Sequence, residues 1–171
     1  QAAELEVSQE QLQEQAAELE VSNEQLQETI EELSRRGAER DAAHGQLATV
    51  LEQSPTGIII AEAPSGRFLF VNRRTHQIFG RSRLSEGVAA YSADWTGYHA
   101  DGPDAGREVA PHEWPIARAV ENGETVSAKV VEIVHADGHR LQISINAAPV
   151  LDPVGRVIAG VAVFDDVSEE R

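Results

Sequence analysis

Apolar and polar residues alternate with a seven-residue period over the first 33 positions of the chain. Gln1–Glu14 and Gln15–Glu28 are the same 14-residue sequence, except that Gln9 is replaced by Asn23. Leucine recurs at every seventh position: Leu5, Leu12, Leu19, Leu26 and Leu33. Such a repeat places the leucines along one seam of a slightly underwound helix. A single helix cannot bury this seam, so the pattern predicts a helix that pairs with another.

The remaining seam positions favour a parallel dimer of defined register. They are Ala2, Gln9, Ala16, Asn23 and Ile30. Asparagine at such a position favours two parallel strands and fixes their register, at a cost in stability. We therefore predict a homodimer whose seam comprises Leu5, Leu12, Leu19, Asn23, Leu26, Ile30, Leu33, Leu47 and Leu51. The alternative is a spacer helix whose leucines meet a different partner.

The seam weakens over residues 35–46, where Gly37, Arg40 and His44 occupy its positions. Glycine costs a helix about 1 kcal/mol relative to alanine, and Gly45 adds a second such residue. The phase nevertheless continues, because Leu47 lies 42 residues after Leu5. We interpret this stretch as a helix of low stability, with a flexible loop as the alternative. The predicted division is a coiled-coil helix over 1–46 and a second domain over 47–171.

The second domain reads as a mixture of short strands and helices. Predicted helices cover 47–54, 73–79 and 111–122, and predicted strands cover 56–63, 67–71, 125–135, 139–150 and 156–165. Residues 81–111 are rich in Gly, Asp and Ser and predict loop with short helical turns. Asp137-Gly138 marks a hairpin. Five strands with helices bunched between them indicate an α+β domain with one antiparallel sheet covered on one face.

Charge and composition exclude several classes of partner and site. The net charge is −15, of which residues 1–46 contribute −9 and residues 47–171 contribute −6. Without a basic stripe, neither nucleic acid nor an anionic membrane surface is expected as a partner. No cysteine is present, which excludes disulfides and thiolate chemistry.

Other features concern the context of the chain. No apolar run approaches the roughly 20 residues that span a bilayer, and no signal-peptide pattern opens the chain. The sequence contains no methionine, so an initiator is absent. We expect a cytoplasmic segment of a longer protein.

Three motifs resemble those of PAS domains. Phe70–Gly80 resembles the strand–helix junction in which an Asn leads into a short helix that ends at Gly. Phe164–Arg171 resembles the terminal PAS motif, with Asp166-Val167-Ser168 in place of Asp-Ile-Thr. His112–Val120, followed by Asn122-Gly123-Glu124, is similar to the helix of a PAS subfamily common in bacterial sensor histidine kinases.

The resemblance covers residues 47–171 and implies the PAS fold, with a five-stranded antiparallel sheet in the order 2-1-5-4-3 and helices on one face. It also implies a sensory or dimerisation role. A heptad-repeat coiled coil before such a domain resembles the linkers of these kinases. Asn72 and Asp166 are then the expected relay residues, with Asp166 capping or orienting an outgoing helix. That helix is expected after Arg171.

A small ligand, if one binds, is expected between the sheet and the middle helices. The candidate core and pocket residues are Ile58, Ile60, Phe68, Phe70, Ile78, Trp114, Val120, Ile143, Ile145 and Val161. We expect no bound cofactor and no metal. Two alternatives remain: haem held by His112 or His99, and a noncovalent flavin stacked on Trp95 or Trp114. The flavin–cysteine chemistry of light-sensing LOV domains is excluded, because the chain lacks cysteine.

Other polar residues carry weaker signals. With a two-residue turn, His135 pairs with Arg140 and His139 with Ala136, so the two histidines point to opposite faces. No nucleophile–base pair, phosphate loop or kinase motif is present, so this segment is not expected to be an enzyme. We predict a sensory, dimeric PAS module of a two-component histidine kinase that acts on an output domain of the same chain. A haem or flavin sensor of gas or redox state, and a structural spacer without ligand, are the alternatives.

Overall fold

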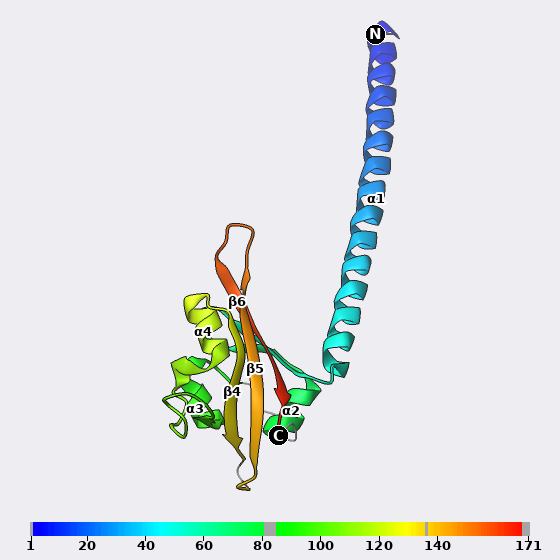
Figure 1. The fold of residues 1–171 in the computed structure, drawn as a ribbon. Helices are drawn as coiled ribbons and strands as arrows, with labels where there is room; N and C mark the ends of the chain where they lie inside the picture. The colour runs from blue at the N-terminus through cyan, green and yellow to red at the C-terminus, as the bar shows by residue number, and fades with distance from the viewer. Residues whose placement is uncertain (1, 81–84, 136, 169–171) are drawn as a thin grey trace. The chain divides into compact units, whose positions relative to one another are not determined.

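A computed structural model describes residues 2–80, 85–135 and 137–168, and the chain divides into two compact units, Gln1–Ala48 and Thr49–Arg171. The described residues of the first unit all lie in one helix. The second contains the sheet and the remaining helices (Figure 1).

Helix α1 (Ala2–Gln53) is continuous over 52 residues. It passes through Gly37 and Gly45, where an added Cβ would meet no atom within 4 Å. The prediction of a helix over residues 35–46 is therefore confirmed, and the loop alternative is wrong. The separate helix predicted over 47–54 is the last part of α1.

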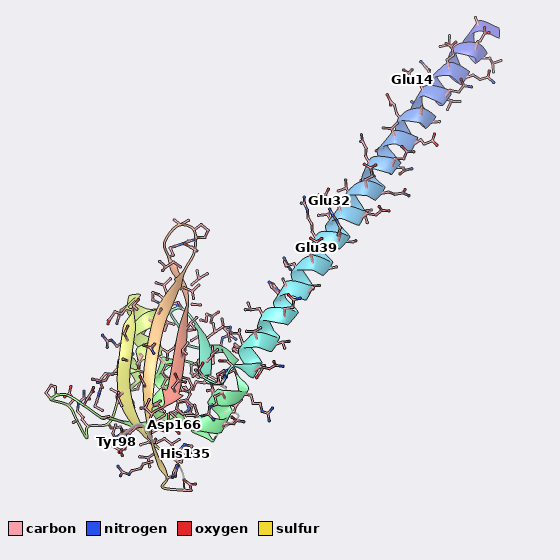
Figure 2. The ribbon with its side chains drawn as sticks, turned by 45° about the vertical axis from the view of Figure 1, so that its right-hand side comes forward. Glu14, Glu32, Glu39, Tyr98, His135 and Asp166 are labelled. Carbon is pink, nitrogen blue, oxygen red and sulfur yellow. The ribbon has the colours of Figure 1, made fainter. Side chains whose placement is uncertain are left out.

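The side chains of α1 at residue 3 and over residues 5–48 are exposed all round the helix. Seam leucines range from 56% exposed at Leu26 to 67% at Leu5. Glutamates such as Glu14, Glu32 and Glu39 project from the same helix (Figure 2). The seam leucines of the first unit are therefore not buried by the helix that carries them.

The sheet has six antiparallel strands in the order β2-β1-β6-β5-β4-β3. Its strands are β1 (Gly57–Glu62), β2 (Phe68–Val71), β3 (Thr96–His99), β4 (Val126–Val134), β5 (Arg140–Leu151) and β6 (Val157–Asp166). The five predicted strands and their order are confirmed. The sixth strand, β3 at the edge of the sheet, lies in the segment predicted as loop. The sequence did not indicate it, because its inward residues are Gly97 and His99, which give no apolar alternation.

The shorter helices cover one face of this sheet, as predicted. They are α2 (Arg73–Phe79), η1 (Val88–Ala90), α3 (Tyr91–Asp94), η2 (Pro111–Glu113) and α4 (Pro115–Asn122). α4 packs on β1, β4, β5 and β6, and α2 packs on β1. No helix among the described residues has the length and apolar character that a bilayer crossing requires.

The helix predicted over 111–122 is broken in two. Trp114 separates η2 from α4 with φ −58° and ψ 135°, outside the helical region. The cause is Pro115, because a proline ring disfavours helical geometry in the residue before it. Gly123 ends α4 in the left-handed conformation, as the sequence indicates.

The hairpin between β4 and β5 corrects the predicted register. Val134 pairs with Arg140, and the His135 N–H donates to the His139 carbonyl at 2.8 Å. The turn is therefore one residue longer than predicted, with Gly138 at φ 84°. His135 and His139 face each other, with ring centroids 6.0 Å apart, rather than pointing to opposite faces. The predicted partner Ala136 lies outside the described residues.

Candidate functional site

Asn72 is the centre of a fully buried hydrogen-bond network. Its Oδ1 accepts from the Ile58 N–H at 2.9 Å, the Thr75 N–H at 3.1 Å and the Thr75 hydroxyl at 2.8 Å. Its Nδ2 donates to the carbonyls of Leu51 at 3.0 Å and Thr56 at 2.9 Å. The side chain is 0% exposed. Asn72 thus joins the last turn of α1, the start of β1 and the start of α2.

A second contact reinforces the same junction. The Glu52 carboxylate in the last turn of α1 accepts from the Arg73 N–H at 2.8 Å. Asn72 is itself the N-cap of α2, whose first N–H groups have no partner within the helix. Because these contacts are directional and mostly buried, a displacement of the last turn of α1 has to move α2 or β1, or break hydrogen bonds.

The end of β6 carries the other predicted relay residue. Asp166 Oδ1 accepts from the Ser168 N–H at 3.0 Å, which is the pattern of a helix N-cap. Ser168 Oγ in turn accepts from the Gln142 N–H at 2.9 Å. Hydrogen bonding to Ser168, aided by the charges of Arg74 and His139, lowers the pKa of Asp166. Residues 169–171, where an outgoing helix would start, lie outside the described part of the chain.

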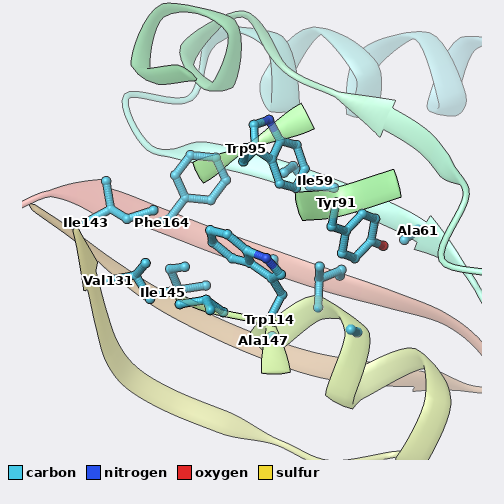
Figure 3. Packing of buried hydrophobic residues seen from close by; sticks show 14 of the residues in the cluster. Ile59, Ala61, Tyr91, Trp95, Trp114, Val131, Ile143, Ile145, Ala147 and Phe164 are labelled. Carbon is cyan, nitrogen blue, oxygen red and sulfur yellow. The ribbon is translucent and has the colours of Figure 1, made fainter. Parts of the chain in front are cut away.

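Six aromatic side chains fill the space between the sheet and the helices, and Figure 3 shows Tyr91, Trp95, Trp114 and Phe164 among them. They are Phe68, Phe79, Tyr91, Trp95, Trp114 and Phe164. Trp95 is central: its ring centroid lies 5.2 Å from that of Phe68, 4.9 Å from Phe79 and 5.8 Å from Trp114. The Tyr91 hydroxyl donates to the Gly66 carbonyl at 2.6 Å, and burial raises the pKa of this phenol.

A small cavity of about 20 Å³ remains inside this cluster. Its walls are apolar and come from Ile59, Phe79, Trp95, Trp114, Pro115, Ile116, Ile145, Ala162 and Phe164. The indole nitrogen of Trp114 is buried and has no hydrogen-bond partner. The interior is therefore an aromatic core with little free volume and one unpaired donor.

The predicted pocket residues divide between the two faces of the sheet. Six lie in the buried cluster: Phe68, Ile78, Trp114, Val120, Ile143 and Ile145. The other four, Ile58, Ile60, Phe70 and Val161, lie outside this cluster, although Ile58 is itself buried at 8% exposed. Side chains alternate along a strand, so the inward position of Ile59 turns Ile58 and Ile60 to the opposite face. Ile60 pairs there with Phe70 and Val161.

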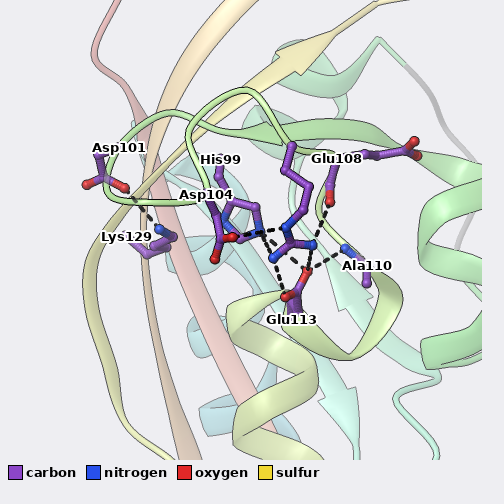
Figure 4. A network of polar contacts seen from close by, with 8 residues as sticks. His99, Asp101, Asp104, Glu108, Ala110, Glu113 and Lys129 are labelled. Atoms are coloured by element: carbon purple, nitrogen blue, oxygen red, sulfur yellow. Dashed lines mark hydrogen bonds and ion pairs between the residues drawn. The ribbon is translucent and has the colours of Figure 1, made fainter.

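The two histidines suggested for haem do not line the interior cavity. His112 is 71% exposed, and its Nδ1 lies 2.9 Å from a Glu121 carboxylate oxygen. His99 is buried beside a polar cluster, with Nε2 3.3 Å from both Glu113 Oε2 and Arg107 Nη2 (Figure 4). Since both imidazoles have protein partners and face other surroundings, the residues present do not fit a haem in the core.

Glu113 organises that polar cluster. It accepts from Arg107 Nη2 at 2.7 Å, Arg107 Nη1 at 2.9 Å and the Ala110 N–H at 2.8 Å. The Arg107 guanidinium and the Ala110 N–H lower the pKa of Glu113 to about 2. Within the described residues, no three His, Asp or Glu side chains are placed to share a metal ion.

A flavin does not fit the interior in this packing either. Ligand pockets for molecules of that size have volumes of about 300–1,000 Å³. The cavity here is about 20 Å³, and Trp95 and Trp114 occupy the space as core residues. Its walls offer no polar group for the hydrogen-bonding edges of an isoalloxazine ring.

Comparison with known proteins agrees with this architecture. A family model described as the PAS fold matches residues 51–171. No curated protein matches the chain.

Several solved structures share the fold at low sequence identity. An RNA-binding light-oxygen-voltage receptor has a TM-score of 0.54 at 21% identity, over 74% of this chain and 33% of the receptor. This chain therefore spans about a third of the receptor's length. A PAS domain from Colwellia psychrerythraea has a TM-score of 0.51 at 15% identity, over 75% of this chain and 99% of that domain.

A PAS domain of an HTR-like protein from Haloarcula marismortui gives a TM-score of 0.52 at 14% identity, over 78% of this chain and 98% of that one. At these identities the structures establish only the fold. The family match spans more than two thirds of the chain and coincides with the six-stranded sheet, its covering helices and the Asn72 junction. The chain therefore belongs to the PAS family.

Proposed function

We propose that the chain is a sensory relay module of a bacterial sensor histidine kinase, and that it works as a dimer joined through α1. A change in the PAS core, or in the contact between two PAS domains, alters the angle or register of α1 and of the helix expected after Arg171. In this proposal the chain is not itself an enzyme, and its output is the activity of a domain further along the same protein.

The observation that carries this proposal is the junction at Asn72. The seam phase extends along one continuous helix to Leu51, and the Leu51 carbonyl accepts from Asn72 Nδ2 at 3.0 Å. The same side chain caps α2, and Arg74 of α2 acts electrostatically on Asp166 at the end of β6. One short helix thus connects the incoming helix with the outgoing strand, which suits a mechanical relay.

A phase change in α1 tests the relay. One alanine inserted after Ala43 rotates the following helix by about 100° relative to the preceding seam. A seven-residue insertion at the same place, repeating residues 37–43, restores the phase and is the matched control. We expect the single insertion to change the output of the parent kinase strongly and the seven-residue insertion to change it little. Equal outputs from both insertions would rule out a relay through α1.

A cofactor sensor is the second candidate, and the fold shared with a light-oxygen-voltage receptor supports it. The packed interior argues against it, as do the positions of His99 and His112. Haem and flavin both absorb visible light, so an absorption spectrum of the purified protein decides this candidate.

A structural spacer without input is the third candidate. It predicts that Ala162→Leu, which would fill the interior cavity, leaves the output of the parent protein unchanged. A relay driven from the core predicts that this substitution alters the output.

A further inference from the structure

Two adjacent arginines of α2 differ from the other basic residues of the second unit. Among the described residues of that unit, Arg73 and Arg74 make no ion pair, although acidic residues outnumber basic ones over 47–171. The remaining described lysines and arginines there each pair with an Asp or Glu: Arg67, Arg107, Arg118, Lys129, Arg140 and Arg156. Both guanidiniums of α2 are therefore open to an acidic group from another molecule.

The acidic residues around these arginines do not neutralise them directly. The Glu52 carboxylate accepts from the Arg73 backbone N–H at 2.8 Å and pairs with neither guanidinium. The charge of Arg74 contributes to lowering the pKa of Asp166, but the two side chains form no ion pair. Arg73 is exposed and Arg74 is partly buried, so a partner can reach both from the surface.

Both arginines line one open groove of the second unit. Its volume is about 600 Å³, and its lining consists of residues 52–55 together with Arg73, Arg74 and Gln77. Apart from Pro55 these residues are polar, whereas pockets for small molecules are mostly apolar and bury most of the ligand. Arginine is enriched in protein interfaces, and their rims are polar. The groove therefore suits a segment of a protein better than a free small molecule.

We infer that this groove docks an acidic segment of a partner protein, in which two Asp or Glu carboxylates pair with the guanidiniums of Arg73 and Arg74. A guanidinium holds a carboxylate through two parallel N–H···O bonds, and clusters of arginine recognise acidic motifs in this way. A long polyanion such as nucleic acid would be repelled by the net charge of −15 on the chain. A short segment contacts the groove alone, and salt screens the more distant charges.

The place of the groove connects docking with the relay proposed above. Its lining includes residues of the last turn of α1 and of α2, the two helices that Asn72 joins. A segment bound there contacts both sides of that junction. The inference rests on the proposed function only in naming a partner class for the relay, and docking itself is tested without signalling output.

The probe is a hexaglutamate peptide, and hexaglutamine is the uncharged control of the same length. In ¹H–¹⁵N spectra of the 171-residue chain, hexaglutamate should shift the amides of Arg73, Arg74 and Gln77 in a saturable way. Hexaglutamine should leave them in place. Inorganic phosphate provides one anionic group instead of two, so it should bind about tenfold more weakly than hexaglutamate.

Substitution of single arginines provides the second arm. Arg73→Gln and Arg74→Gln should each weaken hexaglutamate about tenfold, as expected for the loss of one charge-assisted pair. Arg156→Gln is the matched control, because it changes the net charge by the same amount. Arg156 pairs with Asp152 and lies outside the groove, so its substitution should leave the affinity unchanged.

The inference is overturned if hexaglutamate gives no saturable shift, or if Arg156→Gln weakens its binding as much as Arg73→Gln and Arg74→Gln do. Phosphate that binds as tightly as hexaglutamate also overturns it, since the groove would then be a site for small anions. If one of the two α2 variants does not fold, the other variant and the comparison of probes decide the matter. A relay through α1 would survive each of these results, because the insertion experiment tests it separately.

Discussion

At the scale of single residues, two buried polar side chains of this domain have opposite surroundings. Asn72 uses its oxygen and both amide hydrogens, whereas the indole N–H of Trp114 has no partner. The first arrangement holds three segments together, because one buried side chain bonds to the end of α1, the start of β1 and the start of α2. The second leaves one buried donor without an acceptor.

Asn72→Ala should therefore lower the free energy of unfolding by about 3–4 kcal/mol, because it removes five buried or part-buried hydrogen bonds and takes the acceptor from the Thr75 N–H and the donor from the Thr56 carbonyl. Urea unfolding followed by tryptophan fluorescence measures this, since both tryptophans lie in the core. Asn122→Ala is the matched control: the Asn122 side chain is exposed and donates to Glu124 at 3.2 Å. We expect a loss below about 0.5 kcal/mol for the control, and similar losses in the two variants would contradict the role given to Asn72.

Glu113 gives a prediction about acid stability. Its pKa is lowered from 4.5 to about 2 in the folded protein, so its stabilising effect is complete above pH 4.5 and is lost as the pH falls through 2. The carboxylate is 37% exposed, so water screens its pair with Arg107 and the effect should stay below about 1 kcal/mol. Glu113→Gln should lower the unfolding free energy at pH 7 and flatten its pH dependence between 4.5 and 2.

Urea titrations at several pH values measure this change. Glu108→Gln serves as control, because that exposed side chain carries no ion pair within the described residues. If the unfolding free energy of Glu113→Gln changed with pH as that of the wild type does, the pair with Arg107 would not contribute to acid stability.

At the scale of elements, the same residue type has opposite effects in different surroundings. Gly37 and Gly45 weaken α1, and a Cβ added at either would meet no atom within 4 Å, whereas Gly160 on β6 makes room for α4. A Cβ at Gly160 would lie 2.7 Å from Val120 Cγ1. Glycine thus softens the helix in one place and allows close packing of helix on sheet in the other.

Gly37→Ala and Gly45→Ala should each stabilise α1 by about 1 kcal/mol, because alanine restricts the unfolded chain and fits the helix. Circular dichroism at 222 nm during heating should show greater helicity and a later loss of α1. Gly160→Ala is the opposing case and should destabilise the PAS domain by about 1–3 kcal/mol through overpacking. If neither alanine substitution raised the helicity or delayed its loss on heating, residues 35–46 would not be the helix segment of low stability that the sequence predicts.

At the scale of the whole molecule, charge and the exposed seam bear on association. The first 34 residues contain ten glutamates and no lysine or arginine, while Leu5, Leu12, Leu19, Leu26 and Leu33 lie exposed along one seam. Like charge weakens the pairing of two such helices, and the leucines favour it. A dimer of modest stability is expected from this balance, as suits a helix that transmits strain.

Sedimentation measurements test the dimer with two matched substitutions. Leu19→Glu falls in the predicted seam and should convert the dimer to monomer at micromolar concentration. Val21→Glu lies two residues further on, outside the seam, and should leave the dimer intact. The two side chains are 65% and 54% exposed in the single chain, so only pairing along the seam can distinguish them. A monomeric wild type, or equal effects of both substitutions, would contradict the predicted dimer.

The sequence by itself determined the features that depend on local pattern. The leucine period predicted α1, and the Asn72–Gly80 motif predicted a short capped helix whose caps the structure confirms. Turn residues and apolar runs predicted five of the six strands, because such signals act over a few neighbouring residues. The dimer, the ligand and the relay stay predictions.

Only the tertiary structure decided which side of each strand faces the core. In Ile58-Ile59-Ile60 every residue is apolar, so the sequence gives no alternation, and packing alone places Ile59 inward. Strand β3 is defined by its pairing with β4. Its inward residue is Gly97, which has no side chain because the Trp114 ring fills the space beside it. The β4–β5 register depended on one extra turn residue, which brings His135 and His139 together. These choices depend on contacts between residues far apart in the chain, which no local pattern records.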